Sequence, residues 1–257
     1  MIPQNIITAW SLTHAWSSTE QVEQDLILSR AICLIATNEY LGEELAFRGG
    51  TALHKLHLPV AHRYSEDLDY VRSTGGGVGR LLDTLKDIGR NLGFAATSQI
   101  SEHPKVLWRT RAENGLPLRI KIEVNTHERS PALPLIKKPF SVESLWWSGR
   151  ANVRTFQFPE LIATKLRALY QRSKGRDLYD MWLALTKGGV DPSQILAAFD
   201  PYRPIGYTAK SAVANLQAKL SEGRFRNDLD PLLASAEKDY DIDGAAKMII
   251  EVLLNRL

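Results

Sequence analysis

Two short stretches of sequence decide the fold of this chain. Residues 47–53 read Phe-Arg-Gly-Gly-Thr-Ala-Leu, and residues 63–70 read Arg-Tyr-Ser-Glu-Asp-Leu-Asp-Tyr. The first stretch predicts a short strand over 45–48 that leads through two glycines into a helix over 51–58. The second predicts a strand over 68–71, in which Asp67 and Asp69 point to the same side while Leu68 and Tyr70 turn into the core.

The sequence on either side of these stretches divides into two parts. Strands are predicted over 94–100, 106–112, 118–124 and 153–158, and helices over 18–40 and 79–92. After an N-terminal proline at Pro159 the pattern is almost entirely helical, with further helices over 178–185, 192–199, 208–220 and 244–254. We therefore expect an α/β part, residues 1–158, followed by a helical part, residues 159–257.

Composition excludes several classes of protein. The chain has 257 residues, 44% of them apolar and 24% charged, which excludes wholesale disorder. A formal net charge of +3 excludes a dominantly electrostatic nucleic-acid binder, although it allows a local basic patch. The single cysteine, Cys33, excludes a disulfide framework and is predicted to be buried. With neither a membrane-length apolar stretch nor a secretory signal, we expect a soluble cytoplasmic protein with no membrane partner.

The two aspartates and the two glycines have complementary chemistry. Two hard carboxylates on one face, Asp67 and Asp69, suit Mg²⁺ carrying a nucleoside triphosphate. Gly49 and Gly50 expose backbone N–H groups at a helix start, where phosphate can approach, and the hydroxyl of Thr51 adds a donor. A solvated acidic turn is the alternative for the aspartates, and the upstream Gly-Gly-Thr favours the site.

A third carboxylate, Glu123, lies on the charged face of the strand over 118–124, where aliphatic and charged residues alternate. If an adjacent antiparallel strand brings Glu123 beside the aspartates, it completes a metal site or acts as a general base. The equally weighted alternative is an exposed residue paired with Lys121 or Arg119.

A second group of candidate residues lies in the helical part. Lys165 borders the apolar stripe of its helix, so it either extends to water or reaches a buried anion such as a triphosphate. Arg176 and Asp180 share a helix face with Asp177, and the alternative for them is an ordinary i,i+4 pair worth about 0.3–0.5 kcal/mol.

Basic residues are also concentrated between His103 and Lys121. This segment carries five basic residues against one acid, Glu113, and so offers a polyanion track beside the acidic site. Trp108, which is flanked by these basic residues, either stacks on a base or belongs to the core, the latter being the commoner outcome.

On these residues, the chain resembles the AbiEii/AbiGii toxins, a branch of the nucleotidyltransferase-fold superfamily found in bacterial toxin–antitoxin pairs, and it is similar to the MenT toxins. The resemblance covers roughly residues 45–185 and rests on the two stretches quoted above and on the helix pair over 160–185. It implies a nucleotidyltransferase-like mixed sheet with flanking helices, followed by a helical C-terminal part that contributes to the active site.

The resemblance also implies roles for individual residues. Asp67 and Asp69 would bind Mg²⁺, with Asp69 catalytic, and the residues 49–51 would hold the triphosphate. Lys165 would contact phosphate, while Asp180 with Arg176 and Asp177 would complete the site.

The implied reaction is transfer of nucleoside monophosphate from an NTP to the tRNA 3′ acceptor end, which blocks translation, and the implied partner is an antitoxin encoded nearby. Two alternatives remain open: the acceptor is a hydroxyl of a protein or small molecule, or the chain is a non-catalytic module that binds NTP or RNA.

Overall fold

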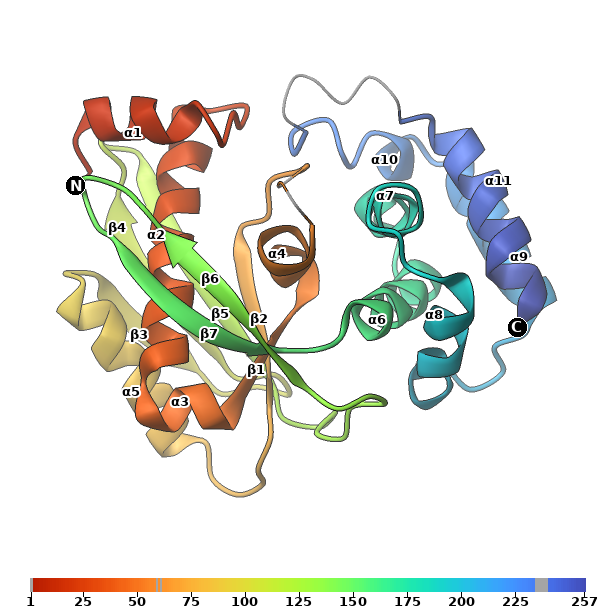
Figure 1. Cartoon of the computed structure of the whole chain (residues 1–257), viewed down its shortest axis with the longest axis horizontal. Coiled ribbons are helices and arrows are strands. Elements are labelled where there is room, and N and C mark those ends of the chain that lie inside the picture. Colours follow the sequence, from red (N-terminus) through yellow and green to blue (C-terminus); the bar gives the residue numbers. More distant parts are fainter. Residues whose placement is uncertain (1, 59, 61, 234–239) are drawn as a thin grey trace. The chain divides into compact units, whose positions relative to one another are not determined.

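Seven strands form one sheet in the computed structural model, which describes residues 2–58, 60, 62–233 and 240–257 (Figure 1). The strands are β1 (Leu45–Arg48), β2 (Asp67–Arg72), β3 (Ala95–Gln99), β4 (Lys105–Arg111), β5 (Pro117–Asn125), β6 (Ile136–Val142) and β7 (Gly149–Thr155). Their order across the sheet is β3-β4-β5-β2-β1-β7-β6. The sheet is mixed, because β2 pairs with β5 and β1 with β7 in parallel while the remaining pairs are antiparallel.

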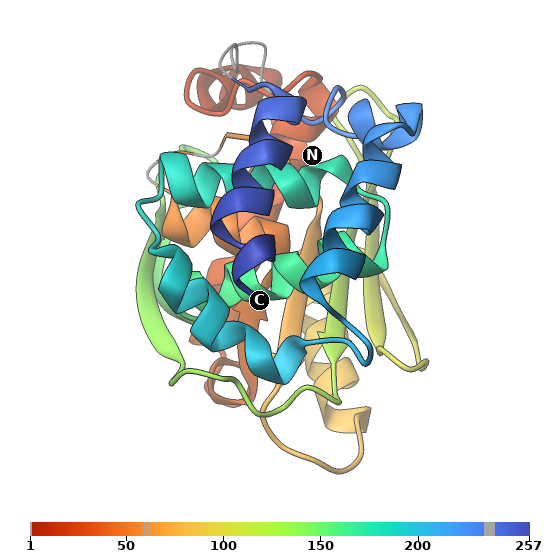
Figure 2. The ribbon, with the colours of Figure 1, turned by 90° about the vertical axis from the view of Figure 1, so that its right-hand side faces the viewer.

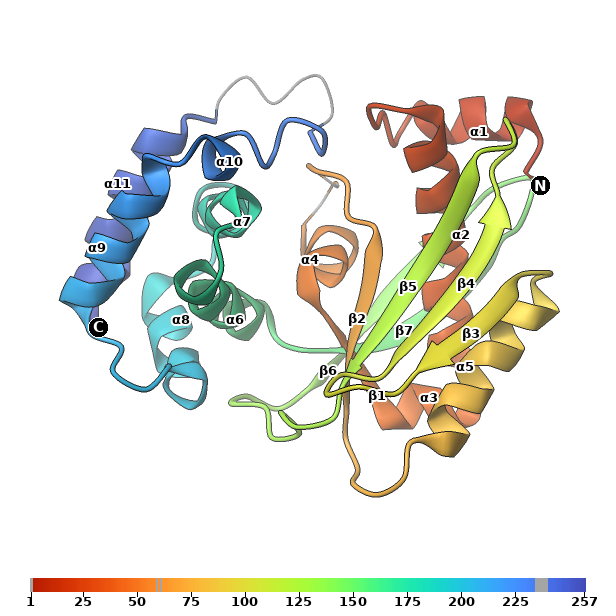
Figure 3. The same cartoon turned by 180° about the vertical axis from the view of Figure 1, so that it is seen from behind.

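The helices of the first half pack against this sheet. They are α1 (Gln4–Ser11), α2 (Thr19–Thr37), α3 (Glu39–Glu44), α4 (Gly49–Ala52), which continues into the π-helical turn η1 (Leu53–His57), and α5 (Gly79–Asn91). Helix α5 packs along β3 and β4, and α2 along β5 and β7, as Figures 1 and 3 show. The face they cover carries the fully buried Trp108, Ile120 and Ile122, so the core of this half lies between these helices and the sheet.

The chain divides into two compact units, one made of residues 1–131 and 135–156 and the other of 132–134 and 157–257. The second unit is helical among its described residues (Figure 2). It contains α6 (Phe158–Gln171), α7 (Gly175–Thr186), α8 (Pro192–Phe199), η2 (Asp200–Tyr202), α9 (Ala209–Leu220), α10 (Gly223–Arg226), α11 (Ile242–Val252) and η3 (Leu254–Arg256). Helices α6, α7 and α8 form its centre, with Leu178, Met181 and Ile195 fully buried.

The α/β class with flanking helices and a helical C-terminal part is therefore confirmed, but several element boundaries are wrong. The helix expected over 18–40 is two helices, because the side chain of Asn38 accepts bonds from the N–H groups of Tyr40 and Leu41 and so begins α3. Strand β7 ends at Thr155, earlier than the expected strand over 153–158, because α6 begins at Phe158.

Several elements have no counterpart among the expectations, among them the short helices η2 and α10. Helix α1 starts after Pro3 without a side-chain cap, and strand β6 contains Pro139. A proline is tolerated in β6 because this strand is at the edge of the sheet and pairs only with β7.

Candidate active site

The parallel pairing of β2 and β5 brings three carboxylates onto one face of the sheet. Asp69 is the register partner of Glu123, and Asp67 is the partner of Lys121. The buried Leu68, 0% exposed, lies on the opposite face, as the alternation predicts. Glu123 thus lies beside the aspartates as proposed, but through a parallel strand and not the antiparallel neighbour that the sequence suggested.

Lysines neutralise part of this cluster. The Nζ atom of Lys121 lies 2.8 Å from Asp67 Oδ2 and 3.6 Å from Glu123 Oε2, and Lys105 Nζ lies 3.3 Å from the same Glu123 oxygen. Burial lowers the pKa of Lys121, but its hydrogen bond to Asp67 and the nearby carboxylates outweigh burial, so the net direction is upward. The pairing alternative for Glu123 is therefore realised with Lys121 and with Lys105.

Asp69 is the least compensated of the three carboxylates. Burial raises its pKa, and the negative charges of Asp67 and Glu123 add to that effect, while Arg48 and Lys121 only partly oppose it. A carboxylate held in such surroundings is stabilised by any cation that binds there. Two adjacent aspartates, one of them desolvated among negative charges, fit a divalent cation with oxygen ligands.

The described residues contain no group of three or more His, Cys, Asp or Glu side chains close enough together to hold a metal ion. Asp67 and Asp69 would therefore hold Mg²⁺ with ligands from outside the protein, such as phosphate or water oxygens. A direct bond from Glu123 to the metal stays a prediction.

Gly49 and Gly50 lie against the same cluster. Gly49 has a φ of +81°, and a side chain there would collide with the carboxylate of Asp69. At Gly50 a side chain would collide with the guanidinium of Arg63, which is 3% exposed. Glycine at position 49 therefore allows the helix start to approach the acidic strand this closely, and glycine at position 50 leaves room for Arg63.

Thr51 holds this helix start to β2. Its hydroxyl lies 2.6 Å from the carbonyl oxygen of Asp67 and 2.8 Å from Ser65 Oγ, and the residue is 2% exposed. The hydroxyl of Thr51 already has these two partners within the protein, so a contact between this hydroxyl and phosphate stays a prediction. Sequence reasoning assigned no role to Ser65 or Arg63, although both belong to the stretch it quoted.

A second charged cluster lies inside the helical unit. Lys165 on α6 is 6% exposed, and its Nζ lies 3.1 Å from Asp177 Oδ1 and 2.8 Å from Asp180 Oδ2, both on α7. Arg172 adds two hydrogen bonds to Asp177, of 2.7 and 2.9 Å. Burial raises the pKa of Asp177, but Lys165 and Arg172 outweigh burial and hold it below its ordinary value.

This geometry decides between the two alternatives that the sequence left open for Lys165. Lys165 does reach a buried anion, and that anion is a pair of aspartates of the chain itself. The backbone N–H of Arg176 donates a 3.2 Å hydrogen bond to Asp228, and its guanidinium lies 3.8 Å from the same carboxylate. The proposed i,i+4 pair of Arg176 with Asp180 stays a prediction. Arg172, which completes the cluster, is not among the site residues that the sequence predicts.

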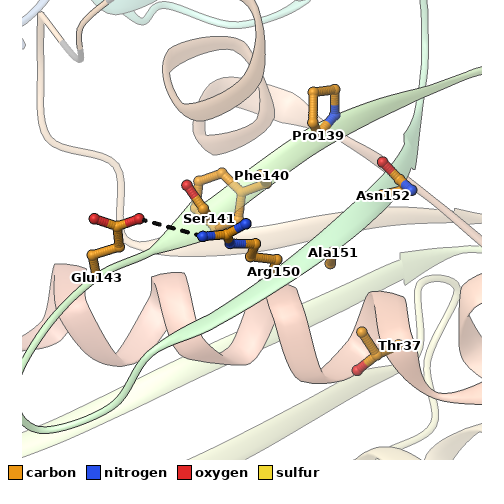
Figure 4. Close-up of a pocket in the computed structure, with 8 residues that line it drawn as sticks. All are labelled: Thr37, Pro139, Phe140, Ser141, Glu143, Arg150, Ala151 and Asn152. Carbon is orange, nitrogen blue, oxygen red and sulfur yellow. Dashed lines mark ion pairs between the residues drawn. The ribbon is translucent and has the colours of Figure 1, made fainter.

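Other features contribute no site residue. Trp108 is 0% exposed and its indole N–H donates to the carbonyl of Leu85, so it belongs to the core and does not stack on a base. Cys33 is buried, and burial raises the pKa of its thiol to about 11. A pocket between the β6–β7 hairpin and the end of α2, lined by Phe140 and Arg150 among others, contains none of the candidate residues (Figure 4).

The comparison with known families is decisive. The family model of the nucleotidyl transferase AbiEii toxin, Type IV toxin–antitoxin system, matches residues 33–247. The chain belongs to this family. As an AbiEii-family member it is a toxin of the nucleotidyltransferase type, which implies a nucleotide substrate and an antitoxin partner. No curated protein sequence matches the chain.

Two solved structures are similar to the chain, and one of them has a TM-score above 0.5. MenT4, a nucleotidyltransferase toxin from Mycobacterium tuberculosis H37Rv, is similar over 97% of this chain and 99% of its own, with 17% identity and a TM-score of 0.54. An antigenic nucleotidyltransferase-like protein from Paracoccidioides brasiliensis matches over 86% of this chain and 92% of its own, with 18% identity and a TM-score of 0.39. The likeness to MenT4 shows a shared fold. Among the described residues, no helix has the length and apolar character needed to span a membrane.

Proposed function

We propose that this AbiEii-family protein is a Mg²⁺-dependent nucleotidyltransferase that adds nucleoside monophosphate from an NTP to the 3′ acceptor end of tRNA and so blocks translation. One observation carries the nucleotide site: the carboxylate of Asp69 lies against Gly49 at the helix start, with Asp67 on the same face. The proposed metal ligands and the backbone groups proposed to bind phosphate are thus close to each other, which supports a nucleotide site at this place on the sheet. The tRNA acceptor comes from the family resemblance, and a cytoplasmic location stays the expectation from the sequence.

The proposed reaction requires little covalent chemistry from the protein itself. The ribose 3′ oxygen forms a bond to the α-phosphorus, the bond from that phosphorus to the bridging oxygen breaks, and pyrophosphate leaves. Bound Mg²⁺ would neutralise negative charge that develops on the phosphates. The backbone N–H groups of Gly49 and Gly50 would orient the triphosphate, and Glu123, the register partner of Asp69, would accept the hydroxyl proton.

The helical residues enter this proposal through the family motif. Lys165 would contact phosphate, and Arg176, Asp177 and Asp180 would complete the last motif. The structure adds that Lys165 is held by Asp177 and Asp180 within its own unit. The two aspartates would thus fix the position of the lysine that carries the phosphate contact.

Incubation with Mg²⁺, each labelled NTP in turn and total tRNA tests the proposal. The wild type is expected to label tRNA with one preferred nucleotide, and Asp69→Ala is expected to lose the label. Asp83→Ala provides a matched control, since Asp83 is an exposed carboxylate on α5 whose side chain is 68% accessible. Labelled protein without labelled RNA would replace the tRNA acceptor by a protein hydroxyl. Nucleotide binding with no transfer to any acceptor would overturn the proposed reaction.

A further inference from the structure

The face of the sheet that carries the acidic cluster continues into a basic surface. Along β5, Arg119 and Lys121 share the face of Glu123. The antiparallel register of β4 places Lys105 opposite Glu123 and Arg109 opposite Arg119 on that same face. Within β3, β4 and β5, the single carboxylate is Glu123, so positive charge dominates the surface beyond it.

The arginines at the far end of this surface are available to a ligand. Arg109, Arg111 and Arg119 are all exposed, in contrast to the lysines nearer the acidic cluster. None of the three makes an ion pair with the residues that the structure describes. Arg109 donates a 2.7 Å hydrogen bond to Thr97 Oγ1 and Arg111 a 2.8 Å bond to the carbonyl of Gly115, which orient each guanidinium and leave further N–H donors for a partner.

The strand register that pairs two arginines of β4 and β5 is electrostatically unfavourable in the protein without a ligand. Arg109 and Arg119 are direct cross-strand partners on an exposed face, and like charges in that position repel. An anion placed between the two guanidinium groups removes that repulsion and can form bidentate hydrogen bonds with them. A phosphodiester backbone offers such anions in a row.

We propose that the exposed face of β3, β4 and β5 is the docking surface for the sugar–phosphate backbone of the acceptor RNA, with Arg109 and Arg119 as its main phosphate contacts. This inference rests on the proposed function, since it is the RNA whose 3′ end reaches the Asp67–Asp69 pair. Phosphate contacts of this kind position a nucleic acid without reading its sequence. The surface therefore holds the acceptor in register and leaves the choice of nucleotide to the acidic site.

The length of the surface predicts how long the RNA must be. Arg119 precedes Glu123 by four residues, and a strand rises by about 3.3 Å per residue, so the two lie about 13 Å apart along β5. Arg119 therefore faces a phosphate upstream of the reacting 3′ end and not the reacting end itself. A dinucleotide acceptor, which has a single internucleotide phosphate, is too short to engage the arginines, whereas a tRNA acceptor-stem hairpin engages both.

The test compares two variants of equal charge. The double variant Arg109→Gln/Arg119→Gln removes the proposed phosphate-binding side chains, and Arg90→Gln/Arg150→Gln removes two exposed arginines of the same unit, on α5 and β7. Fluorescence anisotropy follows binding of a labelled acceptor-stem hairpin over a range of salt concentrations. The slope of log K against log salt should fall by about 1.8 for the test variant, because each phosphate that an arginine neutralises contributes about 0.9 to the slope. The slope should stay unchanged for the control.

Activity and stability supply independent readouts. The test variant should raise KM for the hairpin at least tenfold with little change in kcat, and leave kcat/KM for a dinucleotide acceptor unchanged. Its melting temperature should equal or exceed that of the wild type, because the like-charge pair is gone. This result would show that weaker RNA binding does not come from misfolding.

Several outcomes would overturn the proposal. These are an unchanged salt slope in the test variant, an equal loss of binding in the control variant, or competition by polyglutamate as strong as that by RNA, which would indicate a surface for acidic protein. The proposed reaction and the proposed docking surface can be refuted independently of each other. Transfer to the hairpin with an unchanged KM in the test variant leaves the reaction and removes the surface, while arginine-dependent RNA binding without any transfer leaves the surface and removes the reaction.

Discussion

The carboxylate cluster on β2 and β5, here called the strand cluster, and the charged cluster on α6 and α7, the helix cluster, contain similar residues. They differ in how far these residues are buried and neutralised. Asp67, Asp69 and Glu123 lie on an accessible sheet face, where two lysines neutralise them incompletely. In the helical unit, Asp177 and Asp180 are 0% exposed and are directly paired with Lys165. The first cluster has charge to offer a ligand, whereas the second satisfies its charges internally. Substitutions in the first should therefore affect activity, and those in the second should also affect stability.

The largest expected effect is on activity in the strand cluster. Asp69→Ala should lower nucleotidyl transfer by about 10³-fold or more, because it removes a proposed metal ligand, and such a ligand contributes several kcal/mol to stabilising the transition state. The free energy of unfolding should stay unchanged or rise, because burial and neighbouring carboxylates disfavour the charged form of Asp69. Urea denaturation beside the transfer assay checks both, and a clear loss of stability would contradict the distinction between the clusters.

The next effect is on stability in the helix cluster. Lys165→Met should destabilise the protein by about 3–5 kcal/mol, since it leaves two buried carboxylates without their shared cation. A second substitution, Asp180→Asn, should restore part of that loss. Denaturant titration measures it, and a loss below about 1 kcal/mol would show that Lys165 is not needed for the fold. Lost activity in a Lys165 variant is therefore no proof of a phosphate contact until its stability is known.

Low pH should reduce the contribution of the helix cluster to the stability of the fold. Although burial alone would raise the pKa of Asp177, Lys165 and Arg172 hold it below the ordinary value, so ionised Asp177 stabilises the fold. That contribution is complete above the unfolded pKa of about 3.9 and is lost as the pH falls through the lower folded pKa. Asp177→Asn should be less stable at neutral pH and lose less of its remaining stability in this acid range. Chemical denaturation at successive pH values tests this, and parallel curves for the two proteins would refute it.

The smallest effect is expected at Lys121, which pairs with Asp67 on the half-exposed face. Lys121→Met should change stability by no more than about 1 kcal/mol, because such pairs contribute little. Removing this competing cation should also shift the Mg²⁺ titration midpoint to a severalfold lower concentration. Calorimetric titration with Mg²⁺ measures the shift, with Lys86→Met on α5 as a control for a surface lysine paired with an aspartate. Weaker Mg²⁺ binding in the Lys121 variant would mean that the lysine supports the metal site.

Local sequence determined much of this protein. Alternation along residues 118–124 correctly places Glu123 and Lys121 on the open face and the aliphatic residues in the core. The same rule places Asp67 and Asp69 together, and the side chain of Ser18 caps α2 as expected. These features follow from side-chain periodicity and local hydrogen bonding, which need no information about distant segments.

Tertiary structure decided which segments meet. Asp69 and Glu123 are 54 positions apart, and only the parallel pairing of β2 and β5 makes them neighbours. The cross-strand pairing of Arg109 on β4 with Arg119 on β5 likewise follows from the strand register. In the same way, the packing of α6 against α7 buries Lys165 beside two aspartates. Such outcomes depend on which long-range packing buries the most apolar surface, so a local pattern specifies which side a residue faces but not what it faces.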